Sequence, residues 1–185
     1  MVEQKVSSRY AKALYGIAVQ FDSVEKVYAD MLNVQRTISS NSELLSFIKS
    51  PVINHRKKEA IFDEIFTNQI GETTLEFIKL LAHKQREWLI LSIIRQFEII
   101  YNRENNIVEA TITTAREMDE ATKANVLAAL TKSTAKKIKP TFVINPSIKG
   151  GIMVRIADKV FDASISNKLE NLRVRLKETL DVEIN

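Results

Sequence analysis

The chain has 185 residues and a mass of 21.1 kDa, which suits one mid-sized domain or two small ones. It contains no cysteine and only 2 histidines, so a disulfide framework, a thiolate metal site and a cysteine nucleophile are excluded, and a histidine-based site has little support. With 4 glycines and 3 prolines, it has too few turn residues for an all-β protein. The composition predicts a helix-rich chain that is poorly equipped for catalysis.

The charge balance is mildly basic. The formal net charge is +4, from 27 Lys and Arg against 23 Asp and Glu, and the pI is about 9.2. The densest basic cluster consists of Lys132, Lys136, Lys137 and Lys139, and it contains no aromatic residue. A nucleic-acid-binding helical protein is therefore one alternative, whereas a solvated helix end is the simpler interpretation of the cluster.

No segment of the sequence has the character of a membrane span or a signal peptide. The first ten residues, MVEQKVSSRY, include Glu3 and lack an apolar core. The most apolar stretch, residues 88–101, is interrupted by Arg95 and Glu98, so it falls short of the roughly 18 unbroken apolar residues that mark a membrane span. Any membrane association is expected to come through a partner.

Apolar residues recur at three- and four-residue intervals through the first half of the chain, a spacing that places them on one face of a helix. Asp22 and Glu25 have the form of a capping box before the second helix, and Pro51 ends the third. Asn54 is expected to begin the fourth helix, and Gly71 separates it from the fifth. Because the connectors are short, the helices should form an antiparallel bundle. They are predicted near residues 6–21, 23–38, 42–49, 55–66, 73–84 and 87–105.

The pattern changes at Asn105-Asn106. Residues 107–114 alternate and are rich in β-branched side chains, which predicts a strand. A helix near 119–133, a short strand at 142–144 and a hairpin of 152–156 with 160–161 should follow. The last helix, near 164–180, carries an apolar stripe of Ile165, Leu169, Leu172, Leu176 and Leu180. We predict a mainly α chain, with a six-helix bundle over 1–105 and a small α/β domain over 106–185.

The sequence offers no credible catalytic, cofactor or metal site. Gly150-Gly151 is the one glycine pair, and neither GxxxxGK[ST] nor GxGxxG accompanies it, so a structural turn is predicted. His55 and His83 lie in basic stretches and lack further ligands at metal-binding spacing. An enzyme with a helical cap is a second alternative, supported only by the mixed pattern of the second domain.

Two helices carry more apolar surface than a core needs. The predicted core stripe of the first helix is Tyr10, Ala13, Leu14, Ile17 and Phe21, yet further apolar residues widen the arc to roughly 240°. The fifth helix has a similar excess. Either both helices are central in the bundle, or they form a groove for an amphipathic helix from another protein. The groove residues would be Ala11, Leu14, Tyr15, Ala18, Phe77, Ile78 and Leu81. Trp88 is predicted to lie in the core.

Two segments resemble a known family. Residues 8–15 read SRYAKALY and residues 145–156 read NPSIKGGIMVRI, followed by DKVFD at 158–162. Together they are similar to the delta subunit of bacterial and chloroplast ATP synthase, whose mitochondrial equivalent is the oligomycin-sensitivity-conferring protein. The resemblance covers the whole chain. Arg9 stands where the family commonly has proline, and Ala157 and Ala163 stand where glycine is frequent.

The resemblance implies a stator subunit without catalytic residues or cofactor. In that family the N-terminal six-helix bundle sits on the catalytic head and binds the N-terminal helix of an alpha subunit, and the C-terminal domain engages the b subunits of the peripheral stalk. The link keeps the head from turning with the central stalk, so that rotation is coupled to ATP synthesis. The implied location is the cytoplasmic face of the bacterial inner membrane, with peripheral attachment through partners and no contact with nucleic acid.

Overall fold

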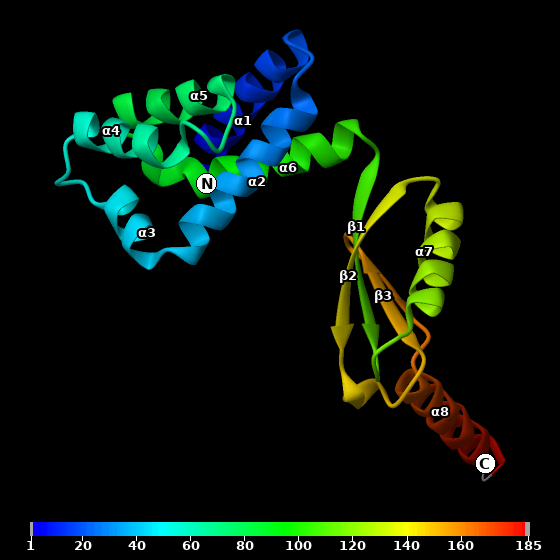
Figure 1. Ribbon diagram of the computed structural model, residues 1–185. Helices are drawn as coiled ribbons and strands as arrows, with labels where there is room; N and C mark the ends of the chain where they lie inside the picture. The colour runs from blue at the N-terminus through cyan, green and yellow to red at the C-terminus, as the bar shows by residue number, and fades with distance from the viewer. Residues whose placement is uncertain (1, 184–185) are drawn as a thin grey trace. The chain divides into compact units, whose positions relative to one another are not determined.

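A change from helices to a sheet divides the chain into two units, Met1–Glu104 and Asn105–Asn185. The computed structural model describes the backbone of residues 2–183 and the side chains of residues 3–175 (Figure 1). Six α-helices lie within residues 2–104, and a mixed four-stranded sheet with further helices follows in the described part of the second unit. The predicted fold class is therefore confirmed.

The N-terminal unit is built from α-helices and one short 3₁₀ helix, η1. These elements are α1 (Val2–Gln20), α2 (Val24–Ser40), α3 (Ser42–Lys49), α4 (His55–Phe66), α5 (Glu72–His83), η1 (Glu87–Leu89) and α6 (Ile90–Glu104). Among the helix pairs, α1 and α6 make the most extensive contact. The inner face of α6 buries Ile93, Ile94 and Phe97 almost completely, so this helix lines the core.

The helix ends follow local hydrogen bonding. Asn41 accepts from the backbone N–H groups of Glu43 and Leu44, both at 3.0 Å, and so caps α3. The capping box predicted at Asp22 is wrong. Asp22 has a φ of +49°, which belongs to the turn, and Ser23 occupies the N-cap position without a side-chain capping bond. The chain reverses direction between α1 and α2, and because Asp22 forms part of that turn it cannot cap α2.

One polar contact joins α2 to the start of α5 within the N-terminal unit. The Asp30 carboxylate accepts from the backbone N–H of Gly71 and from the hydroxyl of Thr74, both at 2.9 Å. Gly71 and Thr74 lie at the N-terminal end of α5, and the Asp30 carboxylate faces them. The unpaired backbone N–H groups at the start of a helix favour a negative charge there. This contact sets where α5 begins against α2.

A second contact joins α2 to α6. The rings of Tyr28 and Tyr101 stack with centroids 3.9 Å apart, and the Tyr101 hydroxyl donates to Glu25 at 2.7 Å. Burial, together with the hydrogen bond to Glu25, raises the pKa of Tyr101 to about 12. The folded unit therefore holds this phenol in its neutral form.

Lys58 is a fully buried cation in α4. Its ammonium group forms an ion pair with Glu87 of η1 and donates to the carbonyl oxygens of Ile48 and Ser50, at 3.0 and 2.7 Å. Because a buried charge is tolerated only when it is paired and hydrogen-bonded, the three acceptors explain why a lysine can stand here. The contact ties the end of α3, the start of α4 and η1 together.

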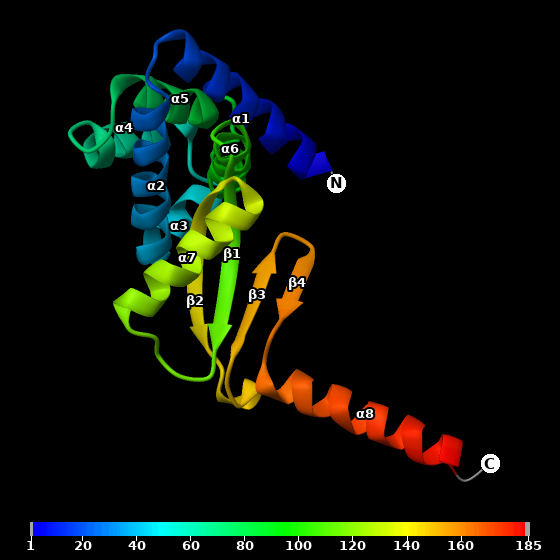
Figure 2. The same cartoon turned by 90° about the vertical axis from the view of Figure 1, so that its right-hand side faces the viewer.

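The C-terminal unit is a sheet with one helix lying against it (Figure 2). Its elements are β1 (Ile107–Thr114), α7 (Glu120–Thr134), β2 (Lys137–Ile144), η2 (Pro146–Ile148), β3 (Ile152–Ile156), β4 (Lys159–Asp162) and α8 (Ile165–Glu183). The strand order is β2-β1-β3-β4. The β1–β2 pair is parallel and needs the crossover through α7, and the two other pairs are antiparallel.

The second strand is longer than predicted. It begins at Lys137 rather than near Phe142 and includes Pro140. Proline lacks an N–H and is tolerated only where one side of the strand has no partner. Because β2 is an edge strand, no strand of the described part of the chain lies on its outer side. Residues 137–144, which include Pro140 and two lysines, can therefore form a strand.

We expect Lys58→Met to lower the free energy of unfolding of the N-terminal unit by about 3 kcal/mol or more, because Glu87 would be left as a buried, unpaired charge. The double variant Lys58→Met/Glu87→Leu should recover most of that loss. Urea unfolding followed by the fluorescence of Trp88, the one tryptophan, measures both. A double variant as unstable as the single one would contradict this account.

The pKa of Tyr101 predicts an alkaline loss of stability. Tyr101 ionises at its ordinary pKa of 10.0 when unfolded and near 12 when folded, so its contribution is complete below pH 10 and is lost as the pH rises towards 12. Between about pH 9 and pH 11, the parent should lose about 1 kcal/mol more stability than Tyr101→Phe. Equal losses in urea titrations of the two proteins would refute the prediction.

Candidate partner-binding surface

The inward face of α1 is made largely of small residues. Ser7, Ala11, Leu14 and Ala18 are each 0% exposed, and they recur at the spacing of one helical face. Two further side chains of α1 contact α6. The Tyr15 ring lies 5.7 Å from the Phe97 ring, and the Glu3 carboxylate accepts a hydrogen bond from the Ser92 hydroxyl. The face that α1 turns to the core is thereby defined.

A neighbouring face of α1 carries apolar side chains that are not covered. The ring of Tyr10 meets the ring of Phe77 edge to face at 6.3 Å, which places this side of α1 next to α5. Ala13 and Ile17 follow Tyr10 on the same side of the helix, and both are exposed. Leu80, one turn after Phe77 on α5, is 45% exposed. We call Tyr10, Ala13, Ile17 and Leu80, together with Phe77, which is itself only 7% exposed, the α1–α5 surface.

Cationic side chains border this surface. The Arg86 guanidinium lies 5.8 Å from the centre of the Tyr10 ring, a distance suited to cation–π attraction. On α1, Arg9 is exposed and stands one turn before Ala13. An apolar surface with two arginines near its Tyr10 end is suited to an amphipathic helix that carries acidic residues beside its apolar stripe.

The residues predicted to form the groove take other positions. Ala11, Leu14, Ala18, Ile78 and Leu81 are at most 1% exposed and belong to the core. Tyr15 is half-buried, and only Phe77 borders the open surface. Most of the predicted core side of α1 is therefore outside: Ala13, Ile17 and Phe21, expected inside, are exposed, whereas Leu14 of the same predicted stripe is buried. The small size of Ser7, Ala11 and Ala18, which allows close helix approach, was the signal that could have decided the orientation.

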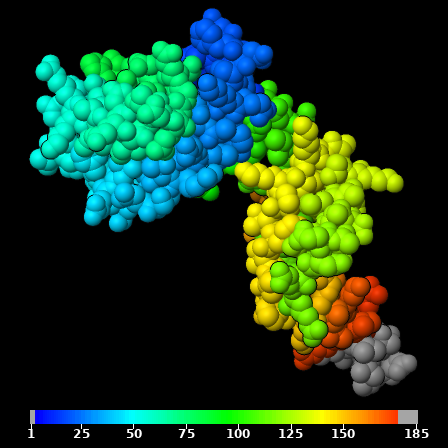
Figure 3. All heavy atoms as spheres, viewed as in Figure 1, coloured from blue at the N-terminus to red at the C-terminus, as the bar shows by residue number. Residues whose placement is uncertain are grey.

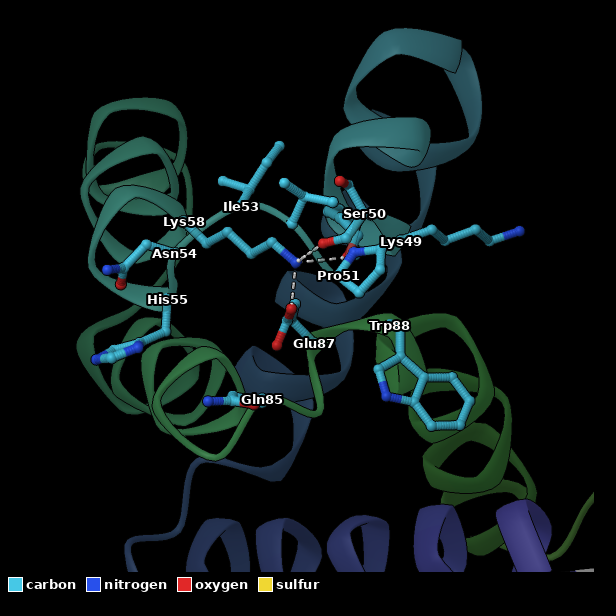
Figure 4. Close-up of a pocket in the computed structure, with 12 residues that line it drawn as sticks. Lys49, Ser50, Pro51, Ile53, Asn54, His55, Lys58, Gln85, Glu87 and Trp88 are labelled. Atoms are coloured by element: carbon cyan, nitrogen blue, oxygen red, sulfur yellow. Dashed lines mark hydrogen bonds and ion pairs between the residues drawn. The ribbon is translucent and has the colours of Figure 1, made fainter.

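A polar pocket lies in the same unit, beside Lys58 (Figure 4). It has a volume of about 440 Å³ and is lined by the loop from Lys49 to Asn54, together with Lys58, Glu87 and Trp88. The ammonium group of Lys58 is occupied by its three acceptors, so it is not available as a free amine. Trp88, predicted to be core, is 48% exposed at the edge of the pocket. The contacts of Lys58 hold the pocket wall together.

The two histidines lie closer together than the sequence suggested. The rings of His55 and His83 meet edge to face with centroids 5.8 Å apart, and His83 Nδ1 lies 3.6 Å from a Glu59 oxygen. Within the described residues, no group of three or more His, Asp or Glu side chains is placed to hold a metal ion.

The glycine pair forms a tight turn in the C-terminal unit. Gly151 has a φ of +76°, and a Cβ there would collide with the carbonyl oxygen of Ala163. A Cβ on Gly150 would lie 2.7 Å from the Ile165 side chain. The pair therefore brings the chain close to the first residues of α8. Exposed apolar side chains of the same unit, Leu169 and Leu172, lie along α8.

Comparisons with known proteins agree over most of the chain. Residues 6–176 match the family model described as ATP synthase delta (OSCP) subunit. The chain belongs to this family. It is 37% identical to ATP synthase subunit delta of Chlorobaculum tepidum over 90% of this chain and 92% of that protein. It is 33% identical to the same subunit of Desulforamulus reducens, over 95% and 97% of the two chains.

A solved structure shares the fold. A chain in the Toxoplasma gondii mitochondrial ATP synthase hexamer matches with a TM-score of 0.71 and 20% identity, over 92% of this chain and 96% of that one. As a delta (OSCP) family member, the protein is a non-catalytic stator subunit of the proton-transporting ATP synthase complex. Over residues 2–183, none of the helices combines the length and apolarity needed to cross a bilayer.

The orientation of α1 predicts that the same substitution destabilises the protein on one face of the helix and not on the other. Ala18→Trp forces a large ring into a fully buried position and should cost about 3 kcal/mol of stability. Ala13→Trp places the ring on the exposed side, and its effect should stay within about 0.5 kcal/mol. Urea unfolding of both variants measures the difference. Equal destabilisation would show that the orientation of α1 is not the one described.

Proposed function

We propose that the protein links the catalytic head of the ATP synthase to its peripheral stalk. The N-terminal unit binds the N-terminal helix of an alpha subunit on the α1–α5 surface, and the C-terminal unit binds the b subunits. Family membership supports the assignment to the stator. The observation that carries the first contact is the exposure of Ala13 and Ile17 on α1 and of Leu80 on α5, the two helices that the Tyr10–Phe77 ring contact joins.

The chemistry of the α1–α5 surface defines the helix that it accepts. The partner lays apolar residues at i, i+3, i+4 and i+7 along this surface. Ala13 has a small side chain, so the partner backbone can approach α1 closely at that point. Arg9 and Arg86 near the Tyr10 end favour acidic residues on the flanks of the incoming helix. The apolar contacts along the α1–α5 surface set the position of the partner helix, and the two arginines favour a partner with acidic flanks.

The mechanical role follows from holding two partners at once. Torque from the rotating central stalk acts on the head, and a subunit bound to both head and stalk opposes that motion. No reacting group is required for this task, since ATP is made by other subunits. We place the protein at the cytoplasmic face of the bacterial membrane, attached peripherally through its partners.

The alternative of nucleic-acid binding gains no support from the basic cluster. Lys132 lies in α7, and Lys137 and Lys139 lie in β2. Glu109 of β1 is in register with Lys139, so an acid is placed within the cluster. Neither a stacking aromatic nor a continuous basic stripe is formed by these residues.

Two exposed apolar residues of α1 provide the test of the alpha-subunit contact. Ile17 is 41% exposed on the α1–α5 surface, and Val19 is 55% exposed on a different side of the helix. We expect Ile17→Asp to weaken binding of a synthetic peptide from the alpha-subunit N-terminus by at least about tenfold, or 1.4 kcal/mol. Val19→Asp, the matched control, should bind like the parent.

Titration calorimetry gives the affinities, and thermal melting confirms that both variants fold. If Ile17→Asp binds the peptide as the parent does, the alpha subunit does not use this surface. If Val19→Asp weakens binding equally, the loss reflects added negative charge rather than a contact on the α1–α5 surface.

A further inference from the structure

The first turn of α8 is attached firmly to the rest of the C-terminal unit. The N–H of Ile165 donates to the carbonyl of Gly150 at 2.9 Å, and the Ser166 hydroxyl donates to the carbonyl of Ser147 at 2.9 Å. The Ser164 hydroxyl accepts from the N–H of Asn167 and caps the helix. The glycine turn thus sets the direction in which α8 leaves the unit, and α8 forms one end of it (Figures 2 and 3).

From Ile165 onward, one side of α8 carries a row of apolar residues with the spacing of a coiled coil, which we call the seam. Ile165, Leu169 and Leu172 follow one another at intervals of four and three residues, which correspond to heptad positions d, a and d. All three are exposed, and Leu172 is 55% exposed. Leu176 continues the spacing in the sequence, although its side chain, like that of Leu180, lies outside the described residues. From Ile165 to Leu176 the seam is about 17 Å long.

The residues beside the seam are basic. In the same heptad, Lys168 and Arg175 occupy g positions and Arg173 occupies an e position. These are the positions that face the flanks of a partner helix in a coiled coil. The acidic residue of this segment, Glu170, occupies position b, and its carboxylate lies 3.8 Å from the Arg173 guanidinium. Because both side chains are largely exposed, this surface ion pair is weak and Arg173 can still meet a partner's carboxylate.

We propose that α8 binds an acidic-flanked amphipathic helix of another chain as a short coiled coil. A second copy of this chain is disfavoured, because Lys168 and Arg173 would face like charges in a parallel or an antiparallel pair. Glutamates at the flanks of the partner would instead complement them. The partner's identity as a b subunit rests on the proposed function, whereas its chemistry follows from the seam and its flanks.

Two designed peptides test the chemistry of the partner. Both carry the same isoleucine and leucine seam, one with Glu at every e and g position and the other with Lys. The full chain should bind the acidic peptide at least about tenfold more tightly in fluorescence anisotropy at low salt, and added salt should narrow the difference. Equal affinities for the two peptides, or no binding of the acidic one, would overturn the proposal.

Two substitutions in one helical turn test the seam itself. Leu172→Asp alters a d position and Val174→Asp alters the f position on the opposite side, and both side chains are exposed in the parent. Leu172→Asp should weaken binding of the acidic peptide at least about tenfold, and Val174→Asp should bind within about twofold of the parent. Equal effects of the two variants would contradict a seam contact. The double variant Lys168→Glu/Arg173→Glu should prefer the basic peptide.

The same variants separate this proposal from the proposed function. The soluble part of the organism's b subunit is titrated against the parent and Leu172→Asp. If b binds both proteins equally, the link to the stalk stands but b does not use the seam, and the seam itself is then judged by the acidic peptide alone. If the acidic peptide binds as expected but b does not bind the parent, the seam is supported and the assignment of b as the partner fails.

Discussion

The close contact between α1 and α6 is the constraint on which the N-terminal unit depends. Helices approach most closely where small side chains meet the neighbouring helix, and Ser7, Ala11 and Ala18 supply such a face on α1. Once this face is turned inward, the rotation of α1 about its axis is determined. Ala13 and Ile17 are then left outside, beside α5. The surface that we assign to a partner is therefore a consequence of core packing.

The sequence was sufficient to predict where the helices lie along the chain, but not which face of α1 is turned to the core. A period of three and four residues marks a helix wherever it occurs, so six helices and the later change to strands could be predicted. An apolar arc wider than the core leaves the inward direction open, however. Ile17 and Phe21 are more apolar than Ala11 and Ala18, which favoured the wrong side. Trp88 also lies outside the core to which it was assigned, since it is 48% exposed.

Long-range polar contacts left no pattern in the sequence. Lys58 is paired with Glu87 across 29 residues, and Asp30 with Gly71 across 41. Each of these side chains resembles an ordinary surface charge on a helix, and only the assembled bundle shows that its partner is near. Strand β2 was shortened for a related reason. Pro140 and the alternating lysines argue against a central strand, and only the strand order shows that β2 is an edge.

The two proposed binding surfaces both favour acidic helices, so charge alone would not keep their partners apart. Their shapes differ. The α1–α5 surface lies between two helices and includes the Tyr10 ring under Arg86, which suits a helix lying along both. On α8, a single row of side chains repeats every three and four residues, which suits a helix with a matching heptad. A partner helix with a broad apolar face would bury only part of that face on the single row of α8. A partner helix with a narrow apolar seam would leave part of the α1–α5 surface uncovered. In the proposed function, the discrimination between head and stalk would thus follow from the width of the apolar face that each surface presents, and the basic residues beside both surfaces would speed the encounter with either partner.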